Sequence, residues 1–288
     1  MKKNIRLKNG TNIPPLGLGT WCIGDRPEKA QQEITALLTG IDQGMTLIDT
    51  AEMYGEGLSE KLVGKVISKY LQKGNREDLY IVSKVLPWNA GRNKIHQACE
   101  SSMKRLEIDY LDLYLYHWIG DIPLAEVVEG LNQLQEQGLI RGWGVSNFDT
   151  ADIKQLLQIP GGENCLVNQN LYHPASRGIE YDLLELMYQH DIIHMSYCPL
   201  AQGGRIAKGL QENATIRDIA EAHNVTPSQV LLAWNIRNGK TVAIPKSASA
   251  NHIMENAAAC DITLTPKELE AIDTAYPPPT CKLPLDTE

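Results

Sequence analysis

Residues 47–55 read Leu-Ile-Asp-Thr-Ala-Glu-Met-Tyr-Gly, and the interpretation of the whole chain starts from this stretch. The apolar run at 45–48 follows a glycine and predicts a buried parallel strand that ends at Asp49. A carboxylate at the rim of an apolar core needs a partner, and the phenol of Tyr54 follows in the next loop. From this stretch alone, a turn capped by Asp49 with Tyr54 packed over it is the simpler interpretation.

Strand-like and helix-like segments alternate on both sides of this stretch. A hairpin is predicted at 4–14, with Asn9-Gly10 as a type I′ turn. The predicted strands are 16–21, 45–49, 79–84, 110–116, 140–145, 165–169, 192–196 and 241–244. The predicted helices cover about 30–41, 59–71, 95–106, 123–137, 150–158, 179–189, 226–237 and 250–258, with two extra helices near 215–222 and 266–275.

Eight strands, each followed by a helix, predict an α/β fold: a (β/α)8 TIM barrel with an N-terminal β-hairpin and two extra helices. An open, doubly wound sheet is the alternative, because it shows the same alternation. Gly17-x-Gly19 does not open a helix, so it fails as a dinucleotide fingerprint. No break in composition marks a second domain, and we expect residues 1–288 to form one barrel domain.

Composition narrows the class of partner. The chain of 288 residues is 43% hydrophobic, carries a net charge of −8 and has no cluster of Lys and Arg, which argues against nucleic acid or an anionic membrane. No apolar run approaches the ~18 residues of a membrane span, so we expect a cytoplasmic monomer. The six cysteines are scattered without zinc-like spacing, so we expect reduced thiols, mostly buried in the core, and no metal site.

The strand ends carry the chemistry, because the C-terminal ends of all barrel strands meet on one face. The residues at or just after these ends are Trp21, Asp49, Lys84, His117, Ser146-Asn147, Gln169, Tyr197 and Pro245-Lys246.

Lys84 ends an apolar strand and needs a counter-ion, which Asp49 on the neighbouring strand can supply. A structural ion pair would satisfy both groups. A cation beside Tyr54 would also stabilise its phenolate and lower the phenol pKa from about 10, which makes this tyrosine a usable proton donor. His117 could be a core histidine, but beside these three residues it more plausibly orients a carbonyl oxygen or assists proton transfer.

These residues resemble the catalytic Asp, Tyr, Lys and His of the aldo-keto reductases, in the same order and at equivalent strand ends. The resemblance runs from the hairpin to about residue 276. Its motifs here are Leu-Ile-Asp-Thr-Ala-x-x-Tyr-Gly, Val-Ser-Lys, Leu-Tyr-x-x-His-Trp, Gly-Val-Ser-Asn-Phe, Asn-Gln-x-x-Tyr-His-Pro, Tyr-x-Pro-Leu and Ile-Pro-Lys-Ser.

The resemblance implies an NADPH-dependent reductase of aldehydes and ketones, in which Tyr54 protonates the oxygen, without a metal. It also implies a set of cofactor contacts. At the nicotinamide, Ser146, Asn147 and Gln169 would hold the amide, Tyr197 would stack on the ring and Asp49 would reach the ribose. Leu200 would line the cofactor site. At the other end, Lys246 and Ser247 would bind the 2′-phosphate, and Glu255 and Asn256 would contact the adenine.

One position departs from the family pattern. His252 stands where an arginine often covers the adenine and 2′-phosphate, and histidine lacks the permanent charge and the fork of arginine. We therefore expect the preference for NADPH over NADH to be weaker than with an arginine, with NADPH still favoured and NADH possible.

The resemblance places the substrate beside Tyr54 and His117, in a pocket walled by Trp21, Trp118 and, from a third loop, Trp88. The loop after Trp118 and the C-terminal tail are short, so we expect an open site for small aldehydes, dicarbonyls or keto-sugars. The overall similarity is greatest to bacterial reductases of methylglyoxal or diketo-gluconate.

Two other functions use the same barrel. A Schiff-base lyase would use Lys84 as a nucleophile, which requires an ammonium without a close carboxylate. A non-catalytic barrel would bind the dinucleotide as a sensor or accessory subunit, although retention of all four catalytic residue types argues against it.

Overall fold

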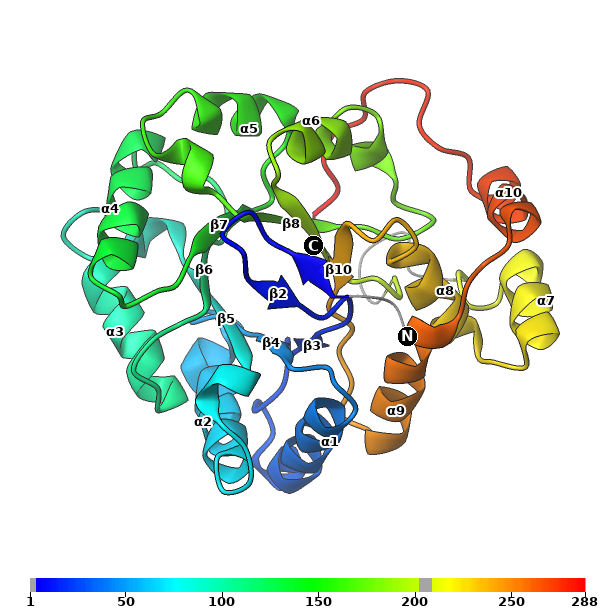
Figure 1. Ribbon diagram of the computed structural model, residues 1–288, viewed down its shortest axis with the longest axis horizontal. Helices are drawn as coiled ribbons and strands as arrows, with labels where there is room; N and C mark the ends of the chain where they lie inside the picture. Colours follow the sequence, from blue (N-terminus) through cyan, green and yellow to red (C-terminus); the bar gives the residue numbers. More distant parts are fainter. Residues whose placement is uncertain (1–3, 202–208, 288) are drawn as a thin grey trace.

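The computed structural model describes residues 4–201 and 209–287, and its centre is a closed parallel barrel (Figure 1). The eight-stranded sheet has the order β10-β9-β8-β7-β6-β5-β4-β3. Parallel bridges from Leu16 to Ala243 and from Gly19 to Lys246 join its two edges. The predicted (β/α)8 barrel is therefore confirmed, and the open sheet is excluded.

The strands are short and the helices surround them (Figure 1). The strands are β1 (Ile5–Arg6), β2 (Asn12–Ile13), β3 (Leu18–Gly19), β4 (Leu47–Asp49), β5 (Tyr80–Val85), β6 (Leu113–Tyr116), β7 (Trp143–Ser146), β8 (Val167–Leu171), β9 (Ile193–Tyr197) and β10 (Thr241–Ala243). The α-helices are α1 (Ala30–Asp42), α2 (Leu58–Tyr70), α3 (Ile95–Leu106), α4 (Leu124–Glu136), α5 (Thr150–Leu157), α6 (Leu183–Gln189), α7 (Ala214–His223), α8 (Pro227–Asn235), α9 (Ala250–Ala258) and α10 (Pro266–Ala275).

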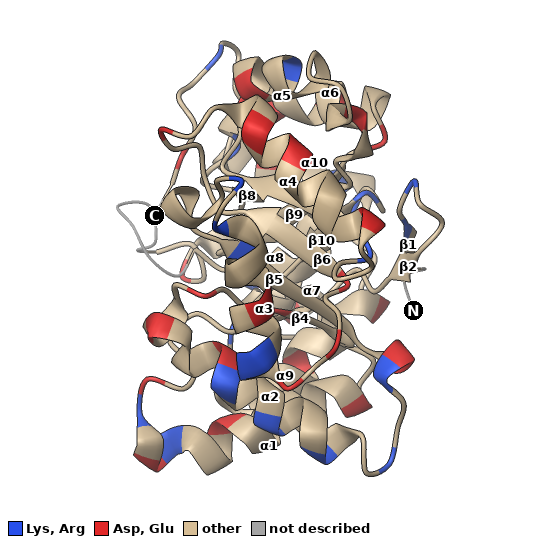
Figure 2. Cartoon of the chain, turned by 90° about the vertical axis from the view of Figure 1, so that its left-hand side faces the viewer, with Lys and Arg blue, Asp and Glu red and all other residues tan. Residues whose placement is uncertain are grey.

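The hairpin β1–β2 closes one end of the barrel. Ile5, Leu7 and Ile13 are buried and share one apolar cluster with inward-facing strand residues such as Leu47 and Val242. In Figure 1 the hairpin lies across the barrel opening, and in Figure 2 it projects at one end of the molecule. The opposite end, where the strands finish, is left for polar side chains.

The hairpin turn differs from its prediction. Gly10 has φ +90, but Asn9 is not among the residues with positive φ, and a type I′ turn needs both. The backbone hydrogen bonds from Leu7 N to Thr11 O and from Gly10 N to Leu7 O span a longer loop instead. The hairpin prediction is confirmed, whereas its turn type is wrong.

Gly19 matters for closure of the barrel. A Cβ added at this position would lie 2.6 Å from the Ile244 carbonyl oxygen, closer than packing allows. Gly19 N also donates to Pro245 O at 3.0 Å. This glycine lets the first and last strands approach, which is a structural role that neither a fingerprint nor a strand pattern predicted.

The extra helices α7 and α10 confirm the two predicted near 215–222 and 266–275. Capping boxes start two of the C-terminal helices: Thr226 pairs with Gln229 at α8, and Thr265 with Glu268 at α10. No helix in the described part of the chain is long and apolar enough to cross a membrane. Acidic and basic residues are interspersed over the face shown in Figure 2.

The cysteines are less buried than predicted. Cys99 and Cys165 are buried, but Cys22 and Cys281 are exposed and Cys198 and Cys260 are partly exposed. The interpretation of most cysteines as core filler is therefore wrong, because three of these four lie in loops or the C-terminal tail and the fourth, Cys260, in the short helix after α9.

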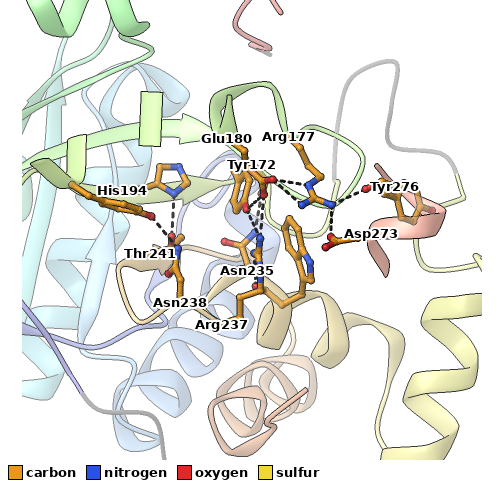
Figure 3. Close-up of polar contacts among 12 residues, drawn as sticks. Tyr172, Arg177, Glu180, His194, Asn235, Arg237, Asn238, Thr241, Asp273 and Tyr276 are labelled. Carbon is orange, nitrogen blue, oxygen red and sulfur yellow. Dashed lines mark hydrogen bonds and ion pairs between the residues drawn. The ribbon is translucent and has the colours of Figure 1, made fainter. Parts of the chain in front are cut away.

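A cluster of charged and aromatic side chains fastens the segment after β8 to α8 and α10 (Figure 3). Arg177 donates to Glu180 from Nε at 2.9 Å and from Nη2 at 2.7 Å, and to Asp273 from Nη1 at 2.6 Å. Arg237 lies 3.8 Å over the Trp234 ring and donates to Glu180 at 3.1 Å. We call Arg177, Glu180, Trp234, Arg237 and Asp273 the outer ionic cluster.

Candidate active site

Alternation along the strands places the polar residues of the site. Leu47, Val82 and Leu115 belong to the apolar cluster inside the barrel, and the residues two positions later are Asp49, Lys84 and His117. The same step leads from Val167 to Gln169, from Met195 to Tyr197 and from Ile244 to Lys246. The site is therefore the outermost layer of the barrel interior, at the end away from the hairpin.

Lys84 lies at the centre of the polar contacts. Its Nζ is 2.7 Å from Asp49 Oδ2, 2.9 Å from the Thr50 carbonyl oxygen and 3.1 Å from the Tyr54 hydroxyl. The lysine is fully buried, and Asp49 is 2% exposed. The predicted grouping of Asp49, Tyr54 and Lys84 is thus present, and one ammonium contacts both the carboxylate and the phenol.

Burial disfavours the charged forms of Lys84 and His117. Burial lowers the pKa of Lys84, and the Asp49 carboxylate opposes that shift. Burial also lowers the pKa of His117 to about 3, with a smaller contribution from Lys84, so this imidazole is neutral at neutral pH. The Nδ1 atom of His117 is buried and has no hydrogen-bond partner among the described residues.

These side chains open onto a cavity of about 500 Å³. Asp49, Tyr54 and His117 line its floor, and the ring of Trp21 packs edge-on against Tyr54 at 5.0 Å between centroids. The remaining lining residues are Gly19, Thr20, Cys22, Met53, Trp118, Ser146, Asn147, Gln169, Tyr197, Cys198, Pro199, Leu200, Ile244, Pro245 and Lys246. No three His, Cys, Asp or Glu side chains suited to a metal ion lie together in residues 4–201 and 209–287.

Comparison with known proteins assigns this arrangement to a family. The model of the Aldo/keto reductase family matches residues 15–277. The chain belongs to the aldo/keto reductase family. The predicted resemblance is confirmed, and the alternation of strands and helices from residue 15 onward is the family's barrel.

Relatives cover nearly the whole reductase. Methylglyoxal reductase YeaE of Escherichia coli is 48% identical over 285 residues, which span 99% of each chain. Glyoxal reductase of Bacillus subtilis is 33% identical over 95% of this chain and 92% of its own length. An aldo-keto reductase of Klebsiella pneumoniae, solved in complex with NADPH, is 50% identical with a TM-score of 0.95 and full coverage of both chains.

The predicted amide-binding residues of the reductase hydrogen-bond to one another and to Asp49. Gln169 donates to Asp49 Oδ1 at 2.8 Å, and Ser146 donates to the Gln169 carbonyl oxygen at 2.9 Å. Tyr197 donates to Asn147 Oδ1 at 2.9 Å, and Asn147 has a left-handed backbone with φ 58. All four line the cavity, so an amide ligand entering it would meet amide and hydroxyl groups beside an aromatic ring.

The residues predicted to contact the far end of the cofactor lie partly inside and partly outside the cavity. Leu200 and Lys246 line the cavity, whereas Ser247 lies just outside its lining. His252 and Glu255 are exposed on α9, and Asn256, on the same helix, is 4% exposed. Ser249 caps α9 by accepting from His252 N, so this end of the helix is formed in advance of any ligand.

Trp88 lies apart from the cavity. It belongs to a short 3-10 helix, Pro87–Asn89, is 57% exposed, and does not line the cavity. It packs edge-on against Trp118 at 6.0 Å between centroids, so it reaches the site only through that ring. Trp21 and Trp118 do line the cavity.

Sequence reasoning assigned no role to several cavity residues in loops, within the motifs or directly beside them. Met53, Cys22 and Pro199 each lie within one or two residues of a predicted site residue. Adjacency to Tyr54, Trp21 and Tyr197 was the available signal. It could not tell which neighbour turns inward, because loop side chains follow no fixed period.

Proposed function

We propose that this aldo/keto reductase uses NADPH to reduce the carbonyl of a small aldehyde or α-dicarbonyl to an alcohol. When bound, NADPH supplies the hydride. The observation that carries the proposal is the 3.1 Å contact between the Lys84 ammonium and the Tyr54 hydroxyl at the floor of the cavity. An ammonium so placed stabilises the phenolate that remains after Tyr54 gives its proton to the substrate oxygen.

The neighbouring groups divide the remaining tasks. Asp49 holds Lys84 in place and balances its charge at 2.7 Å. His117 is neutral, so it can hydrogen-bond a carbonyl oxygen but does not compete with Tyr54 as the acid. Lys84 is fully buried and paired with a carboxylate, which is the opposite of what a Schiff-base nucleophile needs.

The donor set of the cavity fits a nicotinamide dinucleotide. We assign Ser146, Asn147 and Gln169 to the amide, Tyr197 to the ring face and Leu200 to the cavity wall. Lys246 offers a point charge for the 2′-phosphate, and the hydroxyl of Ser247 follows it. His252, Glu255 and Asn256 on α9 are assigned to the adenine end, where a histidine gives a weaker preference for NADPH than an arginine.

The substrate assignment rests on the size of the cavity and on the relatives. Trp21 and Trp118 form aromatic walls beside Tyr54 and His117, and the Trp21 side chain is half exposed. The methylglyoxal and glyoxal reductases among the relatives support a two- or three-carbon dicarbonyl. We further propose that the protein acts as a monomer in the cytoplasm, because scattered cysteines and mixed surface charge call for no partner.

Tyr54→Phe tests the proposal most directly. The substitution removes only the hydroxyl, so turnover of methylglyoxal should fall by about 10³-fold while NADPH binding stays unchanged. Turnover is measured at saturating NADPH, and binding is measured by quenching of the five tryptophans.

Near-normal turnover by this variant would remove Tyr54 as the proton donor. A parallel titration with NADH gives the ratio of the two affinities. Tyr181→Phe is the matched control, because Tyr181 is an exposed tyrosine that precedes α6 and does not line the cavity.

A further inference from the structure

Three buried hydroxyl groups form a chain directly behind the catalytic residues. Thr50 donates to Ser59 Oγ at 3.1 Å, and Ser59 Oγ lies 2.8 Å from Thr20 Oγ1 and 3.1 Å from the Thr20 carbonyl oxygen. Thr20 in turn donates to the Asp49 carbonyl oxygen at 2.8 Å. All three hydroxyl residues are completely buried.

The chain has a consistent direction. A hydroxyl has one proton to donate, and here Thr50 donates to Ser59, Ser59 donates to Thr20, and Thr20 donates to the backbone of Asp49. Every hydroxyl proton therefore has an acceptor. Removing the middle group would leave a buried donor without an acceptor, which is costly.

The chain joins three segments that carry the site. Thr20 follows β3 and precedes Trp21, Thr50 follows β4 and Asp49, and Ser59 lies in the first turn of α2. The carbonyl oxygen of Thr50 is itself an acceptor for the Lys84 ammonium at 2.9 Å. A shift of Thr50 would thus move a ligand of the lysine as well as the end of β4.

The hydrogen bond from Thr50 to Ser59 closes the loop that presents Tyr54. Inside this loop Gly55, Glu56 and Gly57 all have left-handed backbones, with φ of 56, 53 and 88. A run of left-handed residues is an unfavourable conformation, above all at the non-glycine Glu56, so the ends of the loop must be held to maintain it. Glu52 anchors the outer side by accepting from Leu86 N at 2.7 Å.

We propose that Thr50 and Ser59 are positioning residues for proton transfer. The hydrogen bond between their hydroxyls fixes the loop so that the Tyr54 hydroxyl stays within reach of Lys84 and of the substrate oxygen. The inference rests on the proposed function of Tyr54, but neither Thr50 nor Ser59 lines the cavity. Their effect on turnover must therefore pass through the positions of Tyr54 and of Lys84, which the Thr50 carbonyl oxygen contacts.

Three variants test the inference. Thr50→Val removes the hydroxyl and keeps the shape, whereas Thr50→Ser keeps the hydroxyl. We expect Thr50→Val and Ser59→Ala to lower kcat by about tenfold, because small displacements of a reacting group have large effects on rate. KM for methylglyoxal and Kd for NADPH should stay within about twofold, since no binding group is touched. Thr50→Ser should keep most of the turnover.

A double variant adds a second readout. Both substitutions break the same hydrogen bond, so Thr50→Val with Ser59→Ala should be no slower than the worse single variant. Ser102→Ala is the control, because Ser102 is an equally buried hydroxyl on α3 that accepts from Arg105 at 3.2 Å. It should cost stability without changing kcat per NADPH-binding molecule.

The outcomes separate the inference from the proposed function. If Tyr54→Phe abolishes turnover while Thr50→Val and Ser59→Ala retain normal kcat, the positioning role is wrong and the proton donor stands. A Thr50→Ser variant as slow as Thr50→Val would assign the effect to the lost methyl group and overturn the inference. If Tyr54→Phe is itself active, Tyr54 is not the proton donor, and both the proposed function and the positioning role are overturned. Counting active molecules by NADPH stoichiometry keeps poor folding of any variant out of the comparison.

Discussion

The molecule contains two groups of charged residues that are built on different chemistry. In the outer ionic cluster, the planar guanidinium of Arg177 holds Glu180 through two nitrogens at 2.9 and 2.7 Å (Figure 3). In the active site, a single Lys84 ammonium contacts Asp49, a backbone carbonyl and the Tyr54 hydroxyl. A fork fixes geometry, whereas a compact ammonium can stabilise a charge that changes during reaction.

The tryptophan rings beside the two groups differ in their exposure to solvent. Trp234 lies between two arginines, with Arg237 at 3.8 Å and Arg177 at 5.3 Å from its centroid, and has no exposed surface. Trp21, beside Tyr54, is 48% exposed and lines the cavity. The ring of the outer cluster is thus buried, whereas the ring at the site is exposed beside the cavity. The difference predicts that one group serves stability and the other serves turnover.

The largest effect that tests this division is expected from Lys84→Met. Methionine fills similar space without a charge, so the Tyr54 phenolate loses its stabilising cation and kcat should fall by about 10²- to 10³-fold. The measurement is single-turnover reduction of methylglyoxal at saturating NADPH, with active molecules counted by cofactor binding. Retained turnover would show that the ion pair at the site is structural, like the outer cluster.

Glu180→Gln should lower the stability of the protein and leave its turnover unchanged. Arg177 and Arg237 lose the charge of their shared carboxylate, while Arg177 keeps its ion pair with Asp273, so the free energy of unfolding should fall by about 2 kcal/mol. Urea unfolding measures this change, and kcat per folded molecule should stay the same. Glu185→Gln is the control, since Glu185 is an exposed carboxylate on α6. Loss of turnover in the folded variant would break the division.

A smaller effect is expected from two buried neutral histidines, one at the site and one beside the outer cluster. Burial lowers the pKa of His117 at the site and of His194 beside the outer cluster to about 3, from 6.5 in the unfolded chain. Below pH 6.5 these two histidines bind protons in the unfolded chain but stay neutral in the folded chain. Stability that is present above pH 6.5 is therefore lost as the pH falls, by about 1 kcal/mol per histidine at pH 5.5.

His194→Gln checks this sign without touching the site. Its unfolding free energy should fall less between pH 7.5 and pH 5.5 than that of the parent chain, by about 1 kcal/mol. An identical slope for the parent and His194→Gln would mean that His194 takes up its proton over the same pH range in the folded and the unfolded chain.

Much of the fold could be predicted because barrel strands leave a local signal. The apolar runs ending at Asp49, Lys84 and His117 gave the strands, and the parallel direction of barrel strands gave their shared face. The ends of the strands were less accurate: Gln169, predicted as a last strand residue, lies inside β8, which continues to Leu171. Hydrogen bonds to the neighbouring strand decide where a strand stops, and they are not visible in a local pattern.

The sequence by itself determined the barrel, the family and the four residue types at the strand ends, because alternation and residue order are properties of neighbouring positions. Only the tertiary structure decided that the Thr50 carbonyl oxygen also accepts from Lys84, that Trp88 stays outside the cavity, and that Gly19 lets the barrel close. The hydrogen bond from Ser59 to Thr20 spans 39 positions. Contacts of that kind depend on how distant segments pack, which no local period encodes.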